Sequence, residues 1–538
     1  MMVVLIKYVL VIVMTLILRI LYDSIWCYYV TPRRIKKLME RQGITGPNRR
    51  LLTGNIIDIS KMVSYSVSDH CSSIHHNIVP RLLPHYVAWS KQYGTYPGPT
   101  FLDVRWKRFI VWNGTEPRLC LTETEMIKEL LTKHNSVTGK SWLQQQGTKG
   151  FIGRGLLMAN GGAWHHQRHL AAPAFTRDRL KGYAKHMVEC TRMMAGKLRN
   201  EVKESGGDDK EVEIGEEMRR LTADIISRTE FGSSYDKGKE LFSLLTVLQR
   251  LCAQSTRHLC FPGSRFLPSK YNREIKSLKT DVERLLMEII ESRKDNVEIG
   301  RSISYGDDLL GLLLNQMDRN KNNLNMDRNK NNLNVQIIMD ECKTFFFTGH
   351  ETTSLLLTWT LMLLAHNPTW QEKVRHEVRQ VCGQDGIPSV EQLSSLTSLN
   401  KVINESLRLY PPATLLPRMA FEDIKLGDLI IPKGLSIWIP VLAIHHSKEL
   451  WGEDATEFNP ERFSSRNFAS SRHFMPFAAG PRNCIGQNFA MMEAKLILAM
   501  LVSKFSFTIS ENYRHAPIVV LTIKPKYGVQ LILKPLDS

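Results

Sequence analysis

The spacing of apolar residues along the chain predicts long helices and a few short strands. The segments with apolar positions at helical spacing are 179–204, 216–231 and 270–294, followed by a long apolar segment at 335–366. The short runs typical of strands are 109–112, 435–439, 518–523 and 529–533. We therefore expect a mainly α fold with a minor β part.

The first 30 residues are mostly valine, isoleucine, leucine, methionine and aromatic residues, which predicts a single N-terminal transmembrane helix. A basic cluster follows within 31–41, and basic residues stay on the cytoplasmic side of a membrane. We expect residues 1–30 to form the anchor, 31–59 a basic flank and connector, and 60–538 a large domain in the cytosol. A cleaved secretory signal is the alternative, but no small-x-small cleavage site precedes the basic cluster.

Two segments break the pattern of the large domain. Residues 317–325 read MDRNKNNLN, and residues 326–334 repeat them without change. Because so polar a repeat cannot bury a core, we expect a disordered surface loop over 317–334. Residues 95–106 carry two prolines and a glycine between helix-like and strand-like segments.

Composition narrows the class of partner. The formal net charge of +18 suits an acidic protein, an anionic lipid surface or a nucleic acid. No basic run is interleaved with aromatic residues, so we expect no nucleic-acid partner. The nine cysteines are scattered and contain no Cys-x-x-Cys pair, which argues against a zinc ribbon and suits a reducing compartment.

One cysteine, Cys484, lies in the run FAAGPRNCIG at 477–486. A thiolate ligand pushes electron density onto haem iron and favours O–O cleavage. The glycines of the run let the backbone approach a porphyrin, its phenylalanine can pack beside the sulfur, and its arginine can bind a propionate. The helix expected from 487 would place the sulfur near a helix N-terminus, which stabilises a thiolate. A structural cysteine on a glycine-rich turn is the alternative. The candidate residues are Phe477, Gly480, Arg482, Cys484 and Gly486.

These five positions resemble the haem-binding signature of the cytochrome P-450 family, and the resemblance extends over about 43–533. It implies the cytochrome P-450 fold and a haem b held by the Cys484 thiolate. It also implies that electrons come from NADPH through NADPH–cytochrome P-450 reductase, because no flavin or nicotinamide site is visible in the chain.

The resemblance assigns roles to residues far from Cys484. Glu405 and Arg408, in ESLR, match the family's Glu-x-x-Arg helix, and Arg462, in PERF, looks like the third member of that buried ion network. This network fixes the segment that holds the haem loop. The residues that resemble the family's propionate-binding positions are Trp164 and Arg168, in WHHQR, and Arg418.

A further likeness lies in TGHETTS, residues 348–354, within the long apolar segment. A glycine followed by an acid and a threonine can open the helical ladder and admit water. By resemblance, Thr352 hydrogen-bonds to the oxygen being activated and Glu351 helps to deliver the protons that cleave it. A core helix with polar kink residues is the alternative.

At the level of subfamily, the chain resembles the plant cytokinin hydroxylases in residues 43–55, 142–161 and 345–360. Relative to them, 95–106 and 317–334 look inserted. The likeness implies an enzyme of the endoplasmic reticulum membrane that hydroxylates the trans methyl of N6-isopentenyladenine nucleotides to trans-zeatin forms. The alternatives are a monooxygenase of a terpenoid or fatty acid, a haem-thiolate isomerase or dehydratase, and a non-catalytic haem sensor or membrane scaffold.

Overall fold

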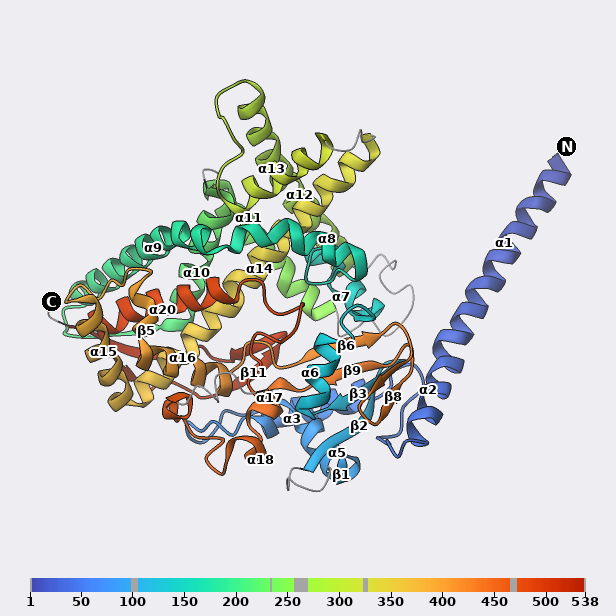
Figure 1. Ribbon diagram of the computed structural model, residues 1–538, viewed down its shortest axis with the longest axis horizontal. Coiled ribbons are helices and arrows are strands. Elements are labelled where there is room, and N and C mark those ends of the chain that lie inside the picture. The colour runs from blue at the N-terminus through green and yellow to red at the C-terminus, as the bar shows by residue number, and fades with distance from the viewer. Residues whose placement is uncertain are drawn as a thin grey trace. The chain divides into compact units, whose positions relative to one another are not determined.

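The computed structural model describes residues 2–97, 105–232, 235–255, 270–322, 328–464 and 472–536 (Figure 1). The chain forms two compact units. The first contains Met1–Ser66, Leu83–Gly139 and Pro417–Pro440, and the second contains Val67–Leu82, Lys140–Leu416 and Val441–Ser538. The helices expected at 179–204, 216–231, 270–294 and 335–366 all lie in the second unit.

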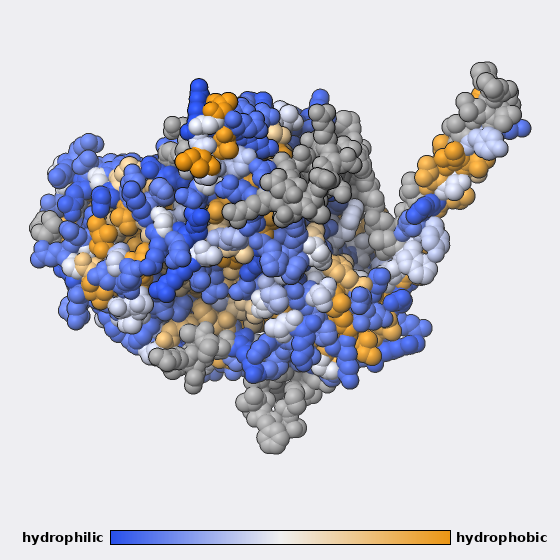
Figure 2. Space-filling model, turned by 45° about the horizontal axis from the view of Figure 1, so that its top comes forward, coloured by the Kyte–Doolittle hydropathy of each residue, from blue (hydrophilic) through white to orange (hydrophobic). Residues whose placement is uncertain are grey.

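The first unit begins with helices. They are α1 (Met2–Ile25), the π-helix η1 (Trp26–Val30), α2 (Thr31–Glu40), α3 (Ile56–Ser66), α5 (Pro84–Tyr93) and α6 (Thr124–Thr132). Apolar side chains of α1 such as Leu10, Val11 and Leu18 are exposed, and Figure 2 shows apolar residues along this helix. Among the residues described, no helix is both long and apolar enough to cross a membrane. The transmembrane helix therefore stays a prediction.

A six-stranded sheet forms the core of the first unit. Its strands, in order, are β1 (Thr95–Pro97), β2 (Arg105–Asn113), β3 (Glu116–Leu121), β9 (Ser436–Ile439), β6 (Leu416–Ala420) and β4 (Thr138–Gly139). β2 and β3 form a hairpin through Gly114, whose φ of 65° suits glycine, and β3 pairs with β9 in parallel. The strands expected at 109–112 and 435–439 are confirmed. Part of 95–106 pairs as β1 with β2, and residues 98–104 lie outside the described residues. A separate hairpin joins β7 (Ile424–Leu426) to β8 (Leu429–Ile431).

The second unit is mainly helical. Its longer helices are α7 (Trp142–Ile152), α8 (Gly161–Ala171), α9 (Arg177–Glu204), α10 (Ile214–Phe231), α11 (Tyr235–Ser255), α12 (Lys270–Glu298), α13 (Leu309–Asn322), α14 (Arg328–His366), α15 (Pro368–Cys382), α16 (Thr397–Leu409) and α20 (Gln487–Lys504). The short helices are α4 (Val79–Leu82), η2 (Ala172–Phe175), η5 (Gln392–Ser394), α17 (Val441–His445), α18 (Lys448–Trp451) and η6 (Pro460–Ser464).

The long helix α14 lies at the centre of the second unit, in contact with α10, α16 and α20 (Figure 1). Its C-terminal half is buried on several faces, including Leu357, Trp359 and Leu361. A helix surrounded by protein is apolar all round, and this explains the long run of apolar residues in this segment.

Two small sheets complete the second unit. β10 (Phe505–Ile509), β13 (Gln530–Pro535) and β5 (Lys210–Glu213) pair antiparallel, so the strand expected at 529–533 is confirmed. The single strand expected at 518–523 is wrong, because β11 (Pro517–Val520) and β12 (Thr522–Pro525) form a hairpin. The chain reverses at Leu521, whose φ of 67° is unusual for leucine. A turn without glycine or asparagine leaves no signal in an apolar run.

The expectation of a disordered loop over 317–334 is wrong wherever the structure describes that segment. α13 continues to Asn322 and α14 begins at Arg328, so only 323–327 lie outside the described residues. The physical reason is that each additional helical residue gains a hydrogen bond once a helix has been nucleated. The polar repeat therefore extends two helices that apolar packing has already established.

Candidate functional site

Cys484 lies in a tight turn that leads into α20. Its backbone N–H donates to the Phe477 carbonyl at 2.9 Å, and the Asn483 N–H donates to the Gly480 carbonyl at 3.0 Å. Gly480 adopts a φ of 71°, which favours glycine. Gly486 is the residue immediately before α20. The predicted placement of the cysteine just before a helix N-terminus is therefore confirmed.

The groups around the Cys484 thiol have opposite effects on its pKa. Burial raises the pKa of this thiol, while the Gly486 N–H and the positive charge of Arg168 act in the opposite direction. A backbone donor and a cation close to the sulfur are the groups that stabilise a thiolate. The net effect of these surroundings is a raised pKa, so the thiolate form depends on a bond to a metal ion, which deprotonates a coordinating thiol.

Cys484 faces a cavity of about 310 Å³ in the second unit. Most of its walls are apolar, with side chains such as Phe345 and Leu356 of α14 and Phe489 of α20. Four of the predicted residues line this cavity together with Cys484, namely Thr352, Phe477, Arg482 and Gly486.

Two arginines of the second unit lie next to the cysteine turn. Arg168 of α8 donates to the backbone oxygen of Asn483 at 2.8 Å and to its side-chain oxygen at 2.9 Å. Arg482 donates to the Ala159 carbonyl at 3.0 Å, and its guanidinium lies 4.5 Å from the centre of the Trp164 ring. The predicted residues Trp164, Arg168 and Arg482 therefore form one group beside the cavity.

Arg418 belongs to β6 of the first unit and is only 4% exposed. Its guanidinium donates to the Pro417 carbonyl at 2.9 Å. Burial lowers its pKa to about 10, and within the described ranges it forms no ion pair with a carboxylate. A buried cation of this kind is costly unless an anion compensates it.

The structure places Thr352 and Glu351 in different surroundings. The Thr352 hydroxyl lines the cysteine cavity and donates to the Thr348 carbonyl at 2.7 Å. Glu351 lines a second cavity of about 430 Å³ and pairs with Lys524 at 2.5 Å. Burial raises the pKa of Glu351, but Lys524 and His350 outweigh that effect and hold it below its ordinary value. The expected opening of the helix is also wrong, because α14 is an unbroken α-helix through 348–354.

Comparison with known proteins decides the class. The family model described as "Cytochrome P450" matches residues 107–531 of this chain. The chain belongs to the cytochrome P450 family. Two proteins of Arabidopsis thaliana named "Cytokinin hydroxylase" are 87% and 76% identical to this P450. The first alignment covers 99% of this chain and 98% of the relative, and the second covers 99% of both. Another, "Cytochrome P450 709B1" from the same plant, is 39% identical over 96% of this chain and 95% of its own.

The P450 is therefore a haem-thiolate monooxygenase that receives electrons from NADPH through a reductase and acts on a small molecule. The cavity that Cys484 faces fits a haem. A planar apolar macrocycle would suit the aliphatic and aromatic walls, and Cys484 among the lining residues could supply the thiolate for its iron. Arg168 and Arg482, next to the cysteine turn, are the cations that could bind the anionic propionates of such a macrocycle.

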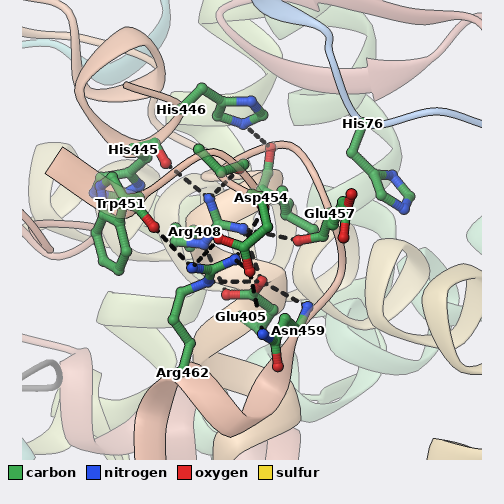
Figure 3. Close-up of polar contacts among 12 residues, drawn as sticks. His76, Glu405, Arg408, His445, His446, Trp451, Asp454, Glu457, Asn459 and Arg462 are labelled. Carbon is green, nitrogen blue, oxygen red and sulfur yellow. Dashed lines mark hydrogen bonds and ion pairs between the residues drawn. The ribbon is translucent and has the colours of Figure 1, made fainter. Parts of the chain in front are cut away.

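A buried ion network holds a second part of this P450 together (Figure 3). Arg408 binds the carboxylate of Glu405 through two hydrogen bonds of 2.7 Å, and both side chains are 0% exposed. Arg408 also donates to three backbone carbonyls, of residues 445, 455 and 457. Arg462 lies 3.6 Å from Glu405, so the structure brings the three predicted members together.

Sequence reasoning missed several members of these sites. The main partner of Arg462 is Asp454, at 2.6 Å, and the Asn459 N–H donates to Glu405 at 2.9 Å. Neither residue belongs to a recognised motif, so their role in the network is visible only in the folded loop.

Glu230 of α10 lines the cysteine cavity with a fully buried carboxyl group, and burial raises its pKa well above the ordinary value. Burial therefore favours the protonated form of this carboxyl group in the cavity wall.

Proposed function

We propose that this P450 hydroxylates the terminal trans methyl of the isopentenyl group of N6-isopentenyladenine-type cytokinins, as nucleotides, to give trans-zeatin forms. The observation that carries the proposal is the identity of 87% over 99% of the chain to a protein named "Cytokinin hydroxylase". The apolar walls around Cys484 and Thr352 suit a prenyl tail, because burying its methyl and methylene groups is favourable.

In this proposal the chain holds the haem through distinct groups. Cys484 ligates the iron through its thiolate, and the turn from Phe477 to Gly486 positions the sulfur. Trp164, Arg168 and Arg482 bind the propionates, and the family resemblance assigns the same role to Arg418. The haem supplies the iron at which oxygen is activated. The apolar wall excludes water and holds the reacting methyl close to the oxidant, where orientation lowers the barrier.

Thr352 and Glu351 have separable roles in the proposal. The Thr352 hydroxyl lies in the cavity wall and can pass a proton at its Oγ1 atom. Glu351 lies beside Lys524 in the second cavity, where its carboxylate can accept a proton from solvent and pass it on. The proton path then runs from that cavity toward the one lined by Thr352.

The test uses microsomes that contain the full chain and a plant NADPH–cytochrome P-450 reductase. Isopentenyladenosine monophosphate, isopentenyladenine and a terpenoid are supplied separately with NADPH, and the products are separated by chromatography. We expect a trans-hydroxylated product from the nucleotide, and none from Cys484→Ser, which also loses the red-shifted carbon monoxide band of thiolate ligation. Turnover of the terpenoid alone would overturn the substrate assignment and leave the monooxygenase class standing.

We propose further that α1 attaches the enzyme to the endoplasmic reticulum membrane as a single-pass anchor, with the rest of the chain in the cytosol. Exposed apolar side chains along α1 and the basic residues of α2 support this, because they suit the lipid interior and its cytosolic surface. Lipid is then a partner as well as the reductase.

A further inference from the structure

A basic hollow lies in the second unit, apart from the cavity that Cys484 faces. Its volume is about 390 Å³. Four cationic side chains line it: Arg192 and Arg199 of α9, Arg379 of α15 and Lys504 at the end of α20. The one carboxylate among its lining residues is Asp385. We call these four residues and the space between them the basic hollow.

Among the described residues, Asp385 is the one lining carboxylate that offsets the positive charges of the basic hollow. In the part of the chain that the structure describes, none of its four cations lies within ion-pairing distance of a carboxylate. Arg199 reaches only a neutral partner, the Leu536 carbonyl, at 3.3 Å. Burial and the repulsion of Arg199 and Arg192 lower the pKa of Lys504, with Asp385 acting in the opposite direction. Like charges gathered in one hollow disfavour each other's charged form, and a bound anion would relieve that repulsion.

Lys197, another basic residue of α9, forms ion pairs. Lys197 of α9 pairs with Glu217 at 3.1 Å and with Glu201 at 3.5 Å. Arg192 and Arg199 are seven residues apart, so they lie two turns apart on one helix face. The basic hollow thus concentrates unpaired charge on one face of a helix whose neighbouring lysine is neutralised.

Small residues also line the basic hollow. Ala195, Gly196 and Ser503 lie among its lining residues. A Cβ atom added at Gly196 would have open space around it. Cations and small side chains around one hollow leave room for a compact group with several oxygens, which arginine forks bind in a bidentate manner.

We propose that the basic hollow binds a multivalent oxyanion, of the kind that a phosphorylated metabolite or the phosphate of a lipid headgroup carries. The site is distinct from the substrate cavity, since Lys504 and the cysteine turn lie at opposite ends of α20. A helix of 18 residues is about 27 Å long. A bound anion would contact α9, α15 and the end of α20, and so relieve the repulsion among the cations that these helices carry.

The test is a calorimetric titration of the haem-loaded, full-length protein with pyrophosphate at constant ionic strength. We expect saturable binding to one site per chain. Arg199→Gln with Lys504→Gln should weaken that binding at least tenfold, because it removes half of the cations. The carbon monoxide spectrum of each variant verifies that its fold and haem are intact.

Two glycines of α9 provide a matched pair of variants. Gly196→Glu places a carboxylate four residues after Arg192 and three before Arg199, where it pairs with both and occupies the hollow. Gly182→Glu adds the same side chain to the same helix, also with open space around its Cβ atom, but outside the hollow. Gly196→Glu should abolish pyrophosphate binding, and Gly182→Glu should leave it within twofold of the parent.

Competition with a soluble short-chain phosphatidic acid distinguishes the sources of the anion. If this lipid displaces pyrophosphate at a concentration below that of the pyrophosphate, the hollow is a headgroup site. If the lipid fails to displace it, the ligand is a free phosphate compound. Both outcomes agree with the proposal. Absence of saturable binding in the parent, or equal affinity in Gly196→Glu and Gly182→Glu, would overturn it.

Discussion

Replacing Glu405 by glutamine should destabilise the protein far more than its small change in shape suggests. One carboxylate oxygen of Glu405 accepts from Arg408 Nη2 and from the Asn459 N–H, and the other accepts from Arg408 Nε at 2.7 Å. Glutamine keeps one acceptor oxygen and turns an NH2 donor toward a guanidinium donor. Arg408 is then left buried with three carbonyl partners and no counter-charge.

The expected magnitude follows from burial. Both members of the pair are 0% exposed, and breaking a fully buried ion pair from one side costs about 3–5 kcal/mol. The matched control is Glu461→Gln. Glu461 stands next to Arg462 in sequence and pairs with Lys373 and Lys401, but its side chain is 48% exposed. An exposed pair contributes about 0–1 kcal/mol.

The assay is guanidinium unfolding of the haem-loaded variants, followed by the thiolate-type carbon monoxide band and by tryptophan fluorescence. If the unfolding free energy of both variants depends equally steeply on guanidinium concentration, the midpoint of Glu405→Gln should fall several times further than that of Glu461→Gln. The reasoning is refuted if the two variants have the same midpoint. In that case the carbonyls around Arg408 alone would stabilise its charge.

Three further predictions concern catalysis, acid stability and the membrane. Thr352→Ala should keep NADPH consumption but lose product, because the cavity loses its hydroxyl; unchanged coupling would remove Thr352 from the reaction. Burial holds the pKa of His445 at about 3, so the unfolded chain binds more protons between about pH 6.5 and 3. The stability contributed by neutral His445 is complete above that window and is lost as the pH falls through it. His445→Gln should therefore flatten the pH dependence of the unfolding midpoint. Removal of residues 1–30 should release the enzyme from microsomes on centrifugation after alkaline washing, and a chain that stays bound would place the attachment elsewhere.

Much of the helical framework could be predicted because its signals are local. The apolar period in 179–204 and 216–231 gives α9 and α10 within a few residues of their bounds. The cysteine turn could be predicted as well, since its conformation depends on neighbours such as Gly480. Such features depend only on contacts between residues that are close in sequence, so the residue types are enough to predict them.

The rest depends on contacts between distant segments, for which one sequence has no signal. Asp454 neutralises Arg462 because a loop folds back on itself, and an aspartate in a loop looks like many others. The reversal at Leu521 depends on its neighbours rather than on a turn residue. The basic hollow combines residues of three helices, and no spacing along the chain predicts that Arg199 and Lys504 meet.

The motif around Glu351 shows how a local signal can be correct in residue type and incomplete in geometry. Adjacent positions of a helix point about 100° apart, so Glu351 and Thr352 reach different cavities although they are neighbours in sequence. Glu351 accepts from the Thr522 hydroxyl at 3.0 Å and pairs with Lys524, and Trp359 Nε1 donates to the Ile523 carbonyl at 3.1 Å. These contacts tie β12 to α14 at two points. Glu351 therefore fixes a hairpin at the same time as it is available for proton transfer, and a change at this residue acts on both.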